Sequence, residues 1–260
     1  MDADWEGKLS VPALRADTLM KNYGSLRVAD AVSFTLPEGA RYALIGPNGA
    51  GKTTLINLLT GIVRPDHGRV YLGGAEITGL DPDRRVKRGL ARTFQINALF
   101  PGLTALESVT LAVAERVGLA PNWRRKLSAC GEAIDEAHTL LRRLNLADDC
   151  VRPTRELSYG RQRLLEIALA LATRPKVLLL DEPAAGVPAA ESAELFEVIA
   201  ALPGEIAVLF IEHDMHLVFR FASRIIVMAG GRILAEGPPA EIASDPEVRA
   251  VYLGGTEIRA

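Results

Sequence analysis

The feature that most constrains this 260-residue chain is a glycine-rich loop between a short apolar run and a helical stretch. Residues 41–45 form the apolar run, residues 46–53 read GPNGAGKT, and the apolar stretch 55–59 follows, closed by Gly61. A strand, such a loop and a helix in this order are typical of sites that hold nucleotide phosphates. Glycines let backbone N–H groups curve around phosphate oxygens, and the positive end of the helix points at the anion.

Two side chains of the loop add specific chemistry. Lys52 supplies a full positive charge for the β- and γ-phosphates, and the Thr53 hydroxyl can bind Mg²⁺. A chance glycine-rich turn is the alternative interpretation, but the strand before the loop and the helix after it argue against that. The sequence therefore predicts a nucleotide site that runs along the whole loop: Gly46, Pro47, Asn48, Gly49, Ala50, Gly51, Lys52, Thr53 and Thr54.

A second segment supplies acidic groups. The continuous apolar run 177–180 predicts a parallel strand buried on both faces, and Asp181 and Glu182 follow it directly. Asp181 is placed to hold Mg²⁺ through water, and Glu182 is placed to polarise an attacking water. An acidic turn with no chemistry is the alternative, and the phosphate loop favours the catalytic interpretation.

The rest of the chain predicts an α/β protein. A strand-like pattern covers 14–36 with a turn near 22–25, and strands alternate with helices from 158 onward, which indicates a mostly parallel sheet. Ser158 can cap a helix that runs to about 173. The stretch 96–157 has helical spacing and contains a polar, basic link at 121–126. The basic run 84–88 is interpreted as a solvated helix face.

These patterns divide the chain into a polar tail and one domain. We expect a tail at 1–12, an α/β core built from 13–95 and 158–260, and a helical subdomain inserted at 96–157.

Composition excludes several classes of protein. The formal net charge of −2 argues against a nucleic-acid binder, and two cysteines cannot build a disulfide framework. The N-terminus is acidic and has no apolar core, unlike a signal peptide. No apolar run approaches the roughly 18–20 residues of a membrane span. We therefore expect a cytoplasmic protein.

Four further segments give the chain a resemblance to the ATP-binding cassette (ABC) ATPases. Residues 157–162 read LSYGRQ, which is similar to the signature motif LSGGQ with tyrosine in the third place. Gln95 in RTFQ resembles the Q-loop glutamine, and His213 in IEHD resembles the switch histidine. Tyr23 lies where the family places an aromatic ring against adenine. Their order and spacing agree along essentially the whole chain.

The resemblance implies a fold and a reaction. The implied fold is a P-loop NTPase core with a mostly parallel sheet, an antiparallel β subdomain and an inserted α-helical subdomain. The implied reaction is hydrolysis of ATP with Mg²⁺, in which Gln95 contacts the metal and takes part in catalysis, and His213 steadies the attacking water. The ATP held by an opposite subunit would be bound by Ser158, Gly160 and Gln162.

The subfamily resemblance is to ATP-binding subunits of branched-chain amino acid uptake systems. It rests on the LSYG variant, on EPAAG at 182–186, on IEHDM at 211–215 and on the tail AEG at 235–237 with YLG at 252–254. The implied partners are two transmembrane permease subunits, a second ABC ATPase subunit of the same or a different kind, and, indirectly, an extracytoplasmic solute-binding protein. The implied location is the inner face of the plasma membrane, with no nucleic acid bound.

Other functions stay open at this point. The ATPase of an amide, urea or other small-solute importer would show the same motifs. A non-transport ABC ATPase of DNA repair or translation is a further alternative. A nucleotide-binding regulator without hydrolysis would lack the catalytic acid, so Glu182 argues against it.

One position departs from the family pattern. The segment after Glu182 normally carries Asn or Asp followed by Pro, whereas here residues 186–189 read GVPA. Pro188 thus replaces a polar residue that bonds across the dimer in the family, and it removes a backbone donor. We expect weaker communication between subunits and slower hydrolysis at one composite site.

Overall fold

The computed structural model describes residues 11–93, 99–119 and 130–253. Residues 1–10 of the tail predicted at 1–12 lie outside these residues, as do Gln95 and the basic link at 121–126. Within them, no helix combines the length and the apolar character that a membrane span requires.

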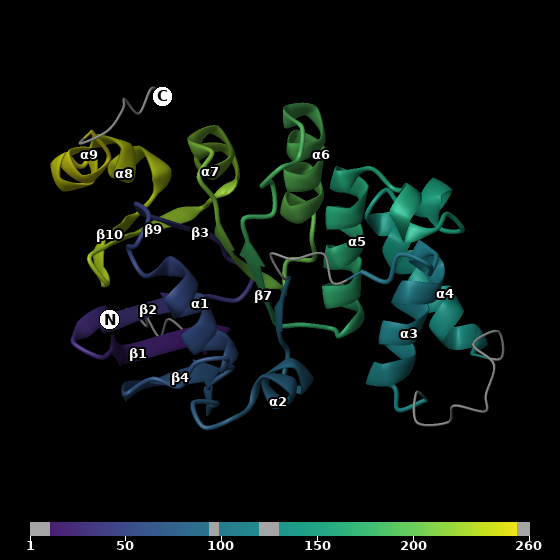
Figure 1. The fold of residues 1–260 in the computed structure, drawn as a ribbon, viewed down its shortest axis with the longest axis horizontal. Coiled ribbons are helices and arrows are strands. Elements are labelled where there is room, and N and C mark those ends of the chain that lie inside the picture. The colour runs from purple at the N-terminus through teal and green to yellow at the C-terminus, as the bar shows by residue number, and fades with distance from the viewer. Residues whose placement is uncertain (1–10, 94–98, 120–129, 254–260) are drawn as a thin grey trace, which may run out of the picture.

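The larger of the two sheets in the described residues carries the predicted parallel strands (Figure 1). Its spatial order is β10 (Arg232–Gly237), β9 (Arg224–Ala229), β3 (Arg41–Ile45), β8 (Ala207–Ile211), β7 (Val177–Asp181) and β6 (Leu90–Arg92). All neighbours pair in parallel except β10 with β9. Every residue of β7 is buried, which confirms the prediction of a strand covered on both faces.

Alternate residues of β7 enter two different cores. Leu178 and Leu180 pack in the core formed with the helices, and Val177 and Leu179 pack in the core formed with the antiparallel sheet. The helices on the first face are α5 (Tyr159–Ala172), α6 (Ala189–Ala200) and α7 (Met215–Phe221). The chain then ends in α8 (Pro239–Ser244) and α9 (Pro246–Leu253).

The second sheet is the predicted antiparallel subdomain. It runs in the order β2 (Leu26–Leu36), β1 (Leu14–Tyr23), β4 (His67–Leu72) and β5 (Ala75–Glu76). Together with α1 (Lys52–Thr60) it covers the other face of the larger sheet (Figure 1). The helix after the glycine-rich loop therefore lies between the two sheets, where its Leu55, Ile56, Leu58 and Leu59 are buried.

Helices α3 (Ala105–Arg116) and α4 (Gly131–Arg143) lie next to α5, on its side away from the two sheets (Figure 1). Thr104 starts α3 with a capping box to Glu107, and 3₁₀ turns at Ala147–Asp149 and Thr154–Glu156 return the chain to α5. These helices lie inside the stretch predicted as the helical subdomain, and its boundaries stay a prediction.

The expectation of a solvated face at residues 84–88 is wrong for Arg85. This residue of α2 (Pro82–Lys87) is only 1% exposed. Its guanidinium donates to the carbonyl oxygens of Leu58 and Leu59, near the end of α1, and to those of Thr78 and Leu80, at 2.6–2.9 Å. Burial lowers its pKa to about 10, so it stays charged at neutral pH. The last carbonyls of a helix lack partners within that helix, and Arg85 supplies donors to two of them.

Replacing Arg85 should destabilise the fold. Arg85→Met leaves two buried and two partly buried carbonyl groups without their donor, so we expect the free energy of unfolding to fall by about 3 kcal/mol. The exposed Arg84 is the matched control, and Arg84→Met should change stability by no more than about 0.5 kcal/mol. Urea unfolding monitored by circular dichroism measures both. Equal effects of the two changes would contradict the role given to Arg85.

Candidate active site

The glycine-rich loop leaves β3 and enters α1 through a left-handed turn. Gly51, the residue before α1, has a φ of 102°. A Cβ atom at this position would lie 2.4 Å from the carbonyl oxygen of Val28, so only glycine fits there. Gly51 has no side chain that could cap the helix. The first backbone N–H groups of α1 are therefore left without a side-chain cap, as an anion site at a helix N-terminus requires.

Lys52 is the first residue of α1, and its side chain reaches back to the loop. Its side chain is buried, and its Nζ donates to the carbonyl oxygens of Gly46 at 2.6 Å and Pro47 at 3.1 Å. Burial lowers the pKa of Lys52, and the charges of Glu182 and Asp181 act in the opposite direction. The ammonium group thus braces the loop and brings positive charge next to the acidic residues after β7.

Asp181 is held by a cation that the sequence reasoning did not single out. Arg92, at the end of β6, donates to Asp181 Oδ2 at 2.6 Å and to the Asn57 side chain on α1 at 2.7 Å. Asp181 is 3% exposed, and its Oδ1 has no hydrogen-bond partner in the described part of the chain. The only sequence signal for Arg92 was its place three residues before Gln95.

These donors fit a magnesium ion bound together with phosphate. Asp181 offers one buried oxygen with no partner among the described residues, and Thr53 offers an exposed hydroxyl in the first turn of α1. The described residues hold no group of three or more His, Cys, Asp or Glu side chains that could bind a metal by themselves. Mg²⁺ usually takes one or two protein oxygens and completes its shell with phosphate and water, which suits this set.

Glu182 and His213 meet although they are distant in sequence. Asp181 and Ile211 are register partners in β7 and β8, so the residues that follow each strand lie side by side. Glu182 adopts a φ of 51°, its N–H donates to the Ile211 carbonyl at 3.1 Å, and its Oε1 lies 2.8 Å from His213 Nε2. A carboxylate can only accept, so His213 Nε2 carries the hydrogen of this bond. Backbone strain of this kind is often concentrated at functional sites.

Ser158 and Gly160 of the predicted signature motif lie at the start of α5, here called the signature corner. The carboxylate of Glu191 from the same chain occupies this corner. Ser158 caps α5, as predicted, and its hydroxyl lies 2.9 Å from Glu191 Oε2. The Gly160 N–H donates to the same oxygen at 3.0 Å. A Cβ atom on Gly160 would lie 2.2 Å from this oxygen, so the carboxylate needs glycine there. Gln162 instead donates to the Leu157 carbonyl at 3.1 Å, in the segment before the helix.

Comparison with known proteins decides the family. Residues 29–185 match the ABC transporter family. The chain belongs to the ABC transporter ATP-binding family. Residues 232–258 also match a branched-chain amino acid ATP-binding cassette transporter family.

The relatives of this ABC protein carry consistent names. It is 41% identical over 256 residues to the high-affinity branched-chain amino acid transport ATP-binding protein LivG of Salmonella typhimurium, covering 95% of this chain and 99% of the relative. BraF of Pseudomonas aeruginosa, with the same description, is 40% identical over the same coverage. A solved ATP-binding cassette of an ABC transporter in its ADP conformation superposes with a TM-score of 0.82 at 33% identity, covering 94% of this chain and 99% of the other.

The structure of this ABC protein brings some predicted residues together and leaves others apart. Lys52, Asp181, Glu182 and His213 gather at the carboxyl ends of β3, β7 and β8. Within the described residues, no hydrogen bond joins the corner of Ser158 and Gly160 to the loop at 46–54. Tyr23 ends β1 with a half-exposed ring. The role of Gln95 stays a prediction because that residue lies outside the described part.

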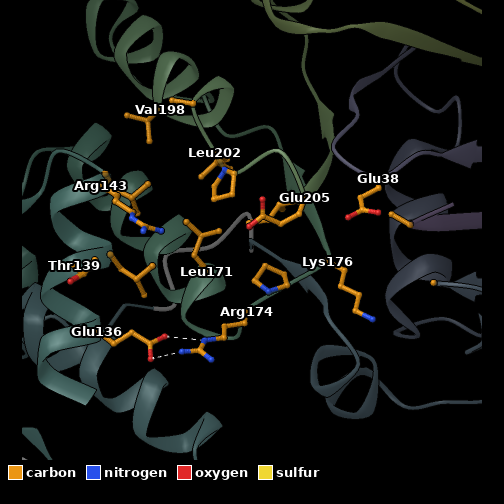
Figure 2. A pocket seen from close by; sticks show the side chains of 18 of the residues that line it. Glu38, Glu136, Thr139, Arg143, Leu171, Arg174, Lys176, Val198, Leu202 and Glu205 are labelled. Atoms are coloured by element: carbon orange, nitrogen blue, oxygen red, sulfur yellow. Dashed lines mark hydrogen bonds and ion pairs between the residues drawn. The ribbon is translucent and has the colours of Figure 1, made fainter. Parts of the chain in front are cut away.

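A separate groove of about 1450 Å³ lies at the opposite ends of the strands (Figure 2). Lys176 precedes β7, Glu205 precedes β8, and both line this groove with Leu171 and Leu202. On its α4 side, Arg174 donates to Glu136 at 3.0 and 3.3 Å. Of the predicted site residues that the structure describes, none lines the groove, so it is not part of the candidate active site.

Proposed function

We propose that this chain binds and hydrolyses ATP to power an importer of branched-chain amino acids. The contact between Glu182 and His213, beside the loop that contains Lys52, carries the proposal for hydrolysis. The names of the LivG and BraF relatives and the matched segment at residues 232–258 support the transported solute. That match also favours transport over the alternatives of DNA repair and translation.

In the proposed chemistry, one set of residues binds the phosphates and another orients the attacking water. The backbone N–H groups of the loop and Lys52 bind the phosphates, and Mg²⁺ held by Thr53 and Asp181, with Gln95 from the sequence prediction, would neutralise their charge. Glu182 accepts a hydrogen bond from the attacking water and orients it. His213 fixes the Glu182 carboxylate through its Nε2–H. Catalysis of phosphoryl transfer is largely positioning and charge stabilisation, which these residues supply.

A second ATPase subunit would complete each site. In this proposal Ser158 and Gly160 bind the γ-phosphate of the ATP held by the opposite subunit. The Glu191 carboxylate supports this use, because it shows one oxygen anion accepting from both groups. A phosphate from the partner would have to replace that carboxylate, since two anions cannot share the same two donors.

The proposed membrane partners are two permease subunits. Phe100 is 66% exposed and Val151 is 70% exposed, and they lie on adjoining segments that are joined by the bridge of Thr104 to Pro153. Exposed apolar side chains of this kind suit a contact with a permease, and Phe100 follows Gln95 closely in the sequence. The subunit would then work at the inner face of the plasma membrane, and a solute-binding protein would act on the other side.

Glu182→Gln tests the assignment of the catalytic group. The amide keeps the shape of the side chain but cannot orient water as a carboxylate does, so we expect hydrolysis to fall roughly 10²–10⁴-fold while ATP affinity stays unchanged. Phosphate release and equilibrium nucleotide binding measure the two quantities. Lys52→Ala is the complementary variant and should lose nucleotide binding. Hydrolysis at the parent rate in Glu182→Gln would contradict the assignment.

Glu191→Gln tests the signature corner. In Glu182→Gln protein, removing the competing charge should lower the ATP concentration needed for association of the two ATPase subunits by roughly fivefold, because charge-assisted hydrogen bonds exceed neutral ones by about 1 kcal/mol. Sedimentation velocity with increasing ATP measures this. Glu194→Gln is the matched control, since Glu194 lies on the same helix, 3.7 Å from Arg161 and off the corner. An equal shift in both variants would show a general charge effect instead.

Pro188→Asn tests the departure from the family pattern. Pro188 precedes α6 without a side-chain cap, and its carbonyl accepts from Ser192 at 2.9 Å. Asparagine restores a backbone N–H and can cap the helix, which adds about 1 kcal/mol of stability. We expect faster ATP turnover in the assembled transporter. Pro188→Ala restores the backbone N–H but provides no helix cap, so comparison of the two variants separates the effect of the N–H from the effect of the cap. Unchanged turnover in both variants would count against weakened communication at this position.

A further inference from the structure

Glu212 is a buried carboxylate that the proposed chemistry does not use. It follows β8 directly, comes immediately before His213, and is 5% exposed. Burial raises its pKa above the usual value of a glutamate, and hydrogen bonds from backbone N–H groups act in the opposite direction. A charged group at such a depth costs stability unless each of its oxygens has a partner.

The two oxygens of Glu212 bind two different loops. Oε1 accepts from the Ala184 N–H at 2.9 Å, in the turn that follows Glu182. Oε2 accepts from the His213 N–H at 3.1 Å, and the Asp214 N–H contributes a further bond. One side chain thus joins the loop after β7 to the loop after β8, and each of these loops carries one member of the Glu182–His213 contact.

Packing alone does not hold these loops together. A cavity of about 330 Å³ lies between them, lined by residues of both loops and by Leu217 of α7. The His213 side chain is half exposed, so few contacts of its own fix its direction. The β7–β8 register brings the starts of the two loops together, and the space between the loops leaves hydrogen bonds such as those of Glu212 to fix their relative position further along.

We propose that Glu212 is a positioning residue that keeps His213 against Glu182. This proposal rests on the proposed hydrolysis of ATP. A carboxylate offers acceptors in both directions, and both loops present only N–H donors to it. Glutamine has the same shape but turns one acceptor into an NH₂ group, which would face a backbone N–H and release one of the loops.

The variant test is Glu212→Gln in the assembled transporter. We expect kcat to fall roughly 10- to 100-fold, since displacement of a catalytic group by about 1 Å has effects of this size. ATP affinity should stay unchanged, because Glu212 makes no described contact with the loop at 46–54. A purely structural role would instead lower thermal stability and leave kcat per folded molecule unaltered.

Glu166→Gln is the matched control. Glu166 is also a buried glutamate whose pKa is raised by burial, but it lies within α5 and pairs with Arg163. Its substitution removes a buried charge of the same kind without touching either loop, so kcat should stay at the parent value. Equal losses of kcat in Glu166→Gln and Glu212→Gln would overturn the proposal, as would a parent kcat in Glu212→Gln.

A second measurement needs no variant. The Ala184 and His213 amides share one acceptor side chain, so in the full-length wild-type chain their hydrogen exchange should show similar opening free energies, which we expect to agree within about 1 kcal/mol. Protection of one amide without the other would overturn the proposal. Absence of ATP hydrolysis by the wild-type transporter would instead overturn the proposed function. The exchange measurement would still test whether Glu212 links the two loops, because it does not depend on hydrolysis.

Discussion

The parallel pairing of β3, β8 and β7 is the constraint on which the site depends. These strands are neighbours in that order, so their carboxyl ends open on the same edge of the sheet. The glycine-rich loop leaves β3, His213 lies just after β8, Asp181 ends β7 and Glu182 follows it. The histidine strand lies between the other two, which puts His213 within reach of Glu182 without any long connection. A shift of one residue in the β7–β8 register would turn alternate side chains to the other face and separate the pair.

Buried charges at this edge are compensated one by one. Lys52 donates to two carbonyl oxygens of its own loop, Asp181 accepts from Arg92, and Glu212 accepts backbone N–H groups from two loops. Each of these groups loses hydration on burial, and each regains hydrogen bonds in a fixed direction. The directions matter for the proposed function, because they leave Asp181 Oδ1 without a partner in the described structure and keep Glu182 partly exposed. Electrostatic positioning and stability therefore depend on the same contacts.

Sequence reasoning predicted what local patterns determine. The strand at 177–180, the loop at 46–53 and the Ser158 cap follow from hydrophobic runs, glycine spacing and a hydroxyl before a helix, and the structure contains all three. It did not identify Arg85, Arg92, Glu191 or Glu212, whose partners are distant in sequence. A run of basic residues does not tell which one points inward, and Arg85 does so because the end of α1 presents carbonyl groups to it. Such contacts are tertiary properties, and a single sequence carries no periodic signal for them.

The segment from Ala184 to Glu191 connects two parts of the proposed site that the sequence motifs treat separately. At one end Glu212 holds the Ala184 N–H beside the catalytic pair, and at the other end Glu191 occupies the corner of Ser158 and Gly160. Pro188 lies between them and begins α6. Under the proposed function, a phosphate that displaces Glu191 would act on the first turn of α6, and the short chain back to Ala184 would transmit any movement of that turn toward Glu182 and His213. In that case the proposed closure of a second subunit and the geometry of the Glu182–His213 contact would be linked through one continuous piece of backbone.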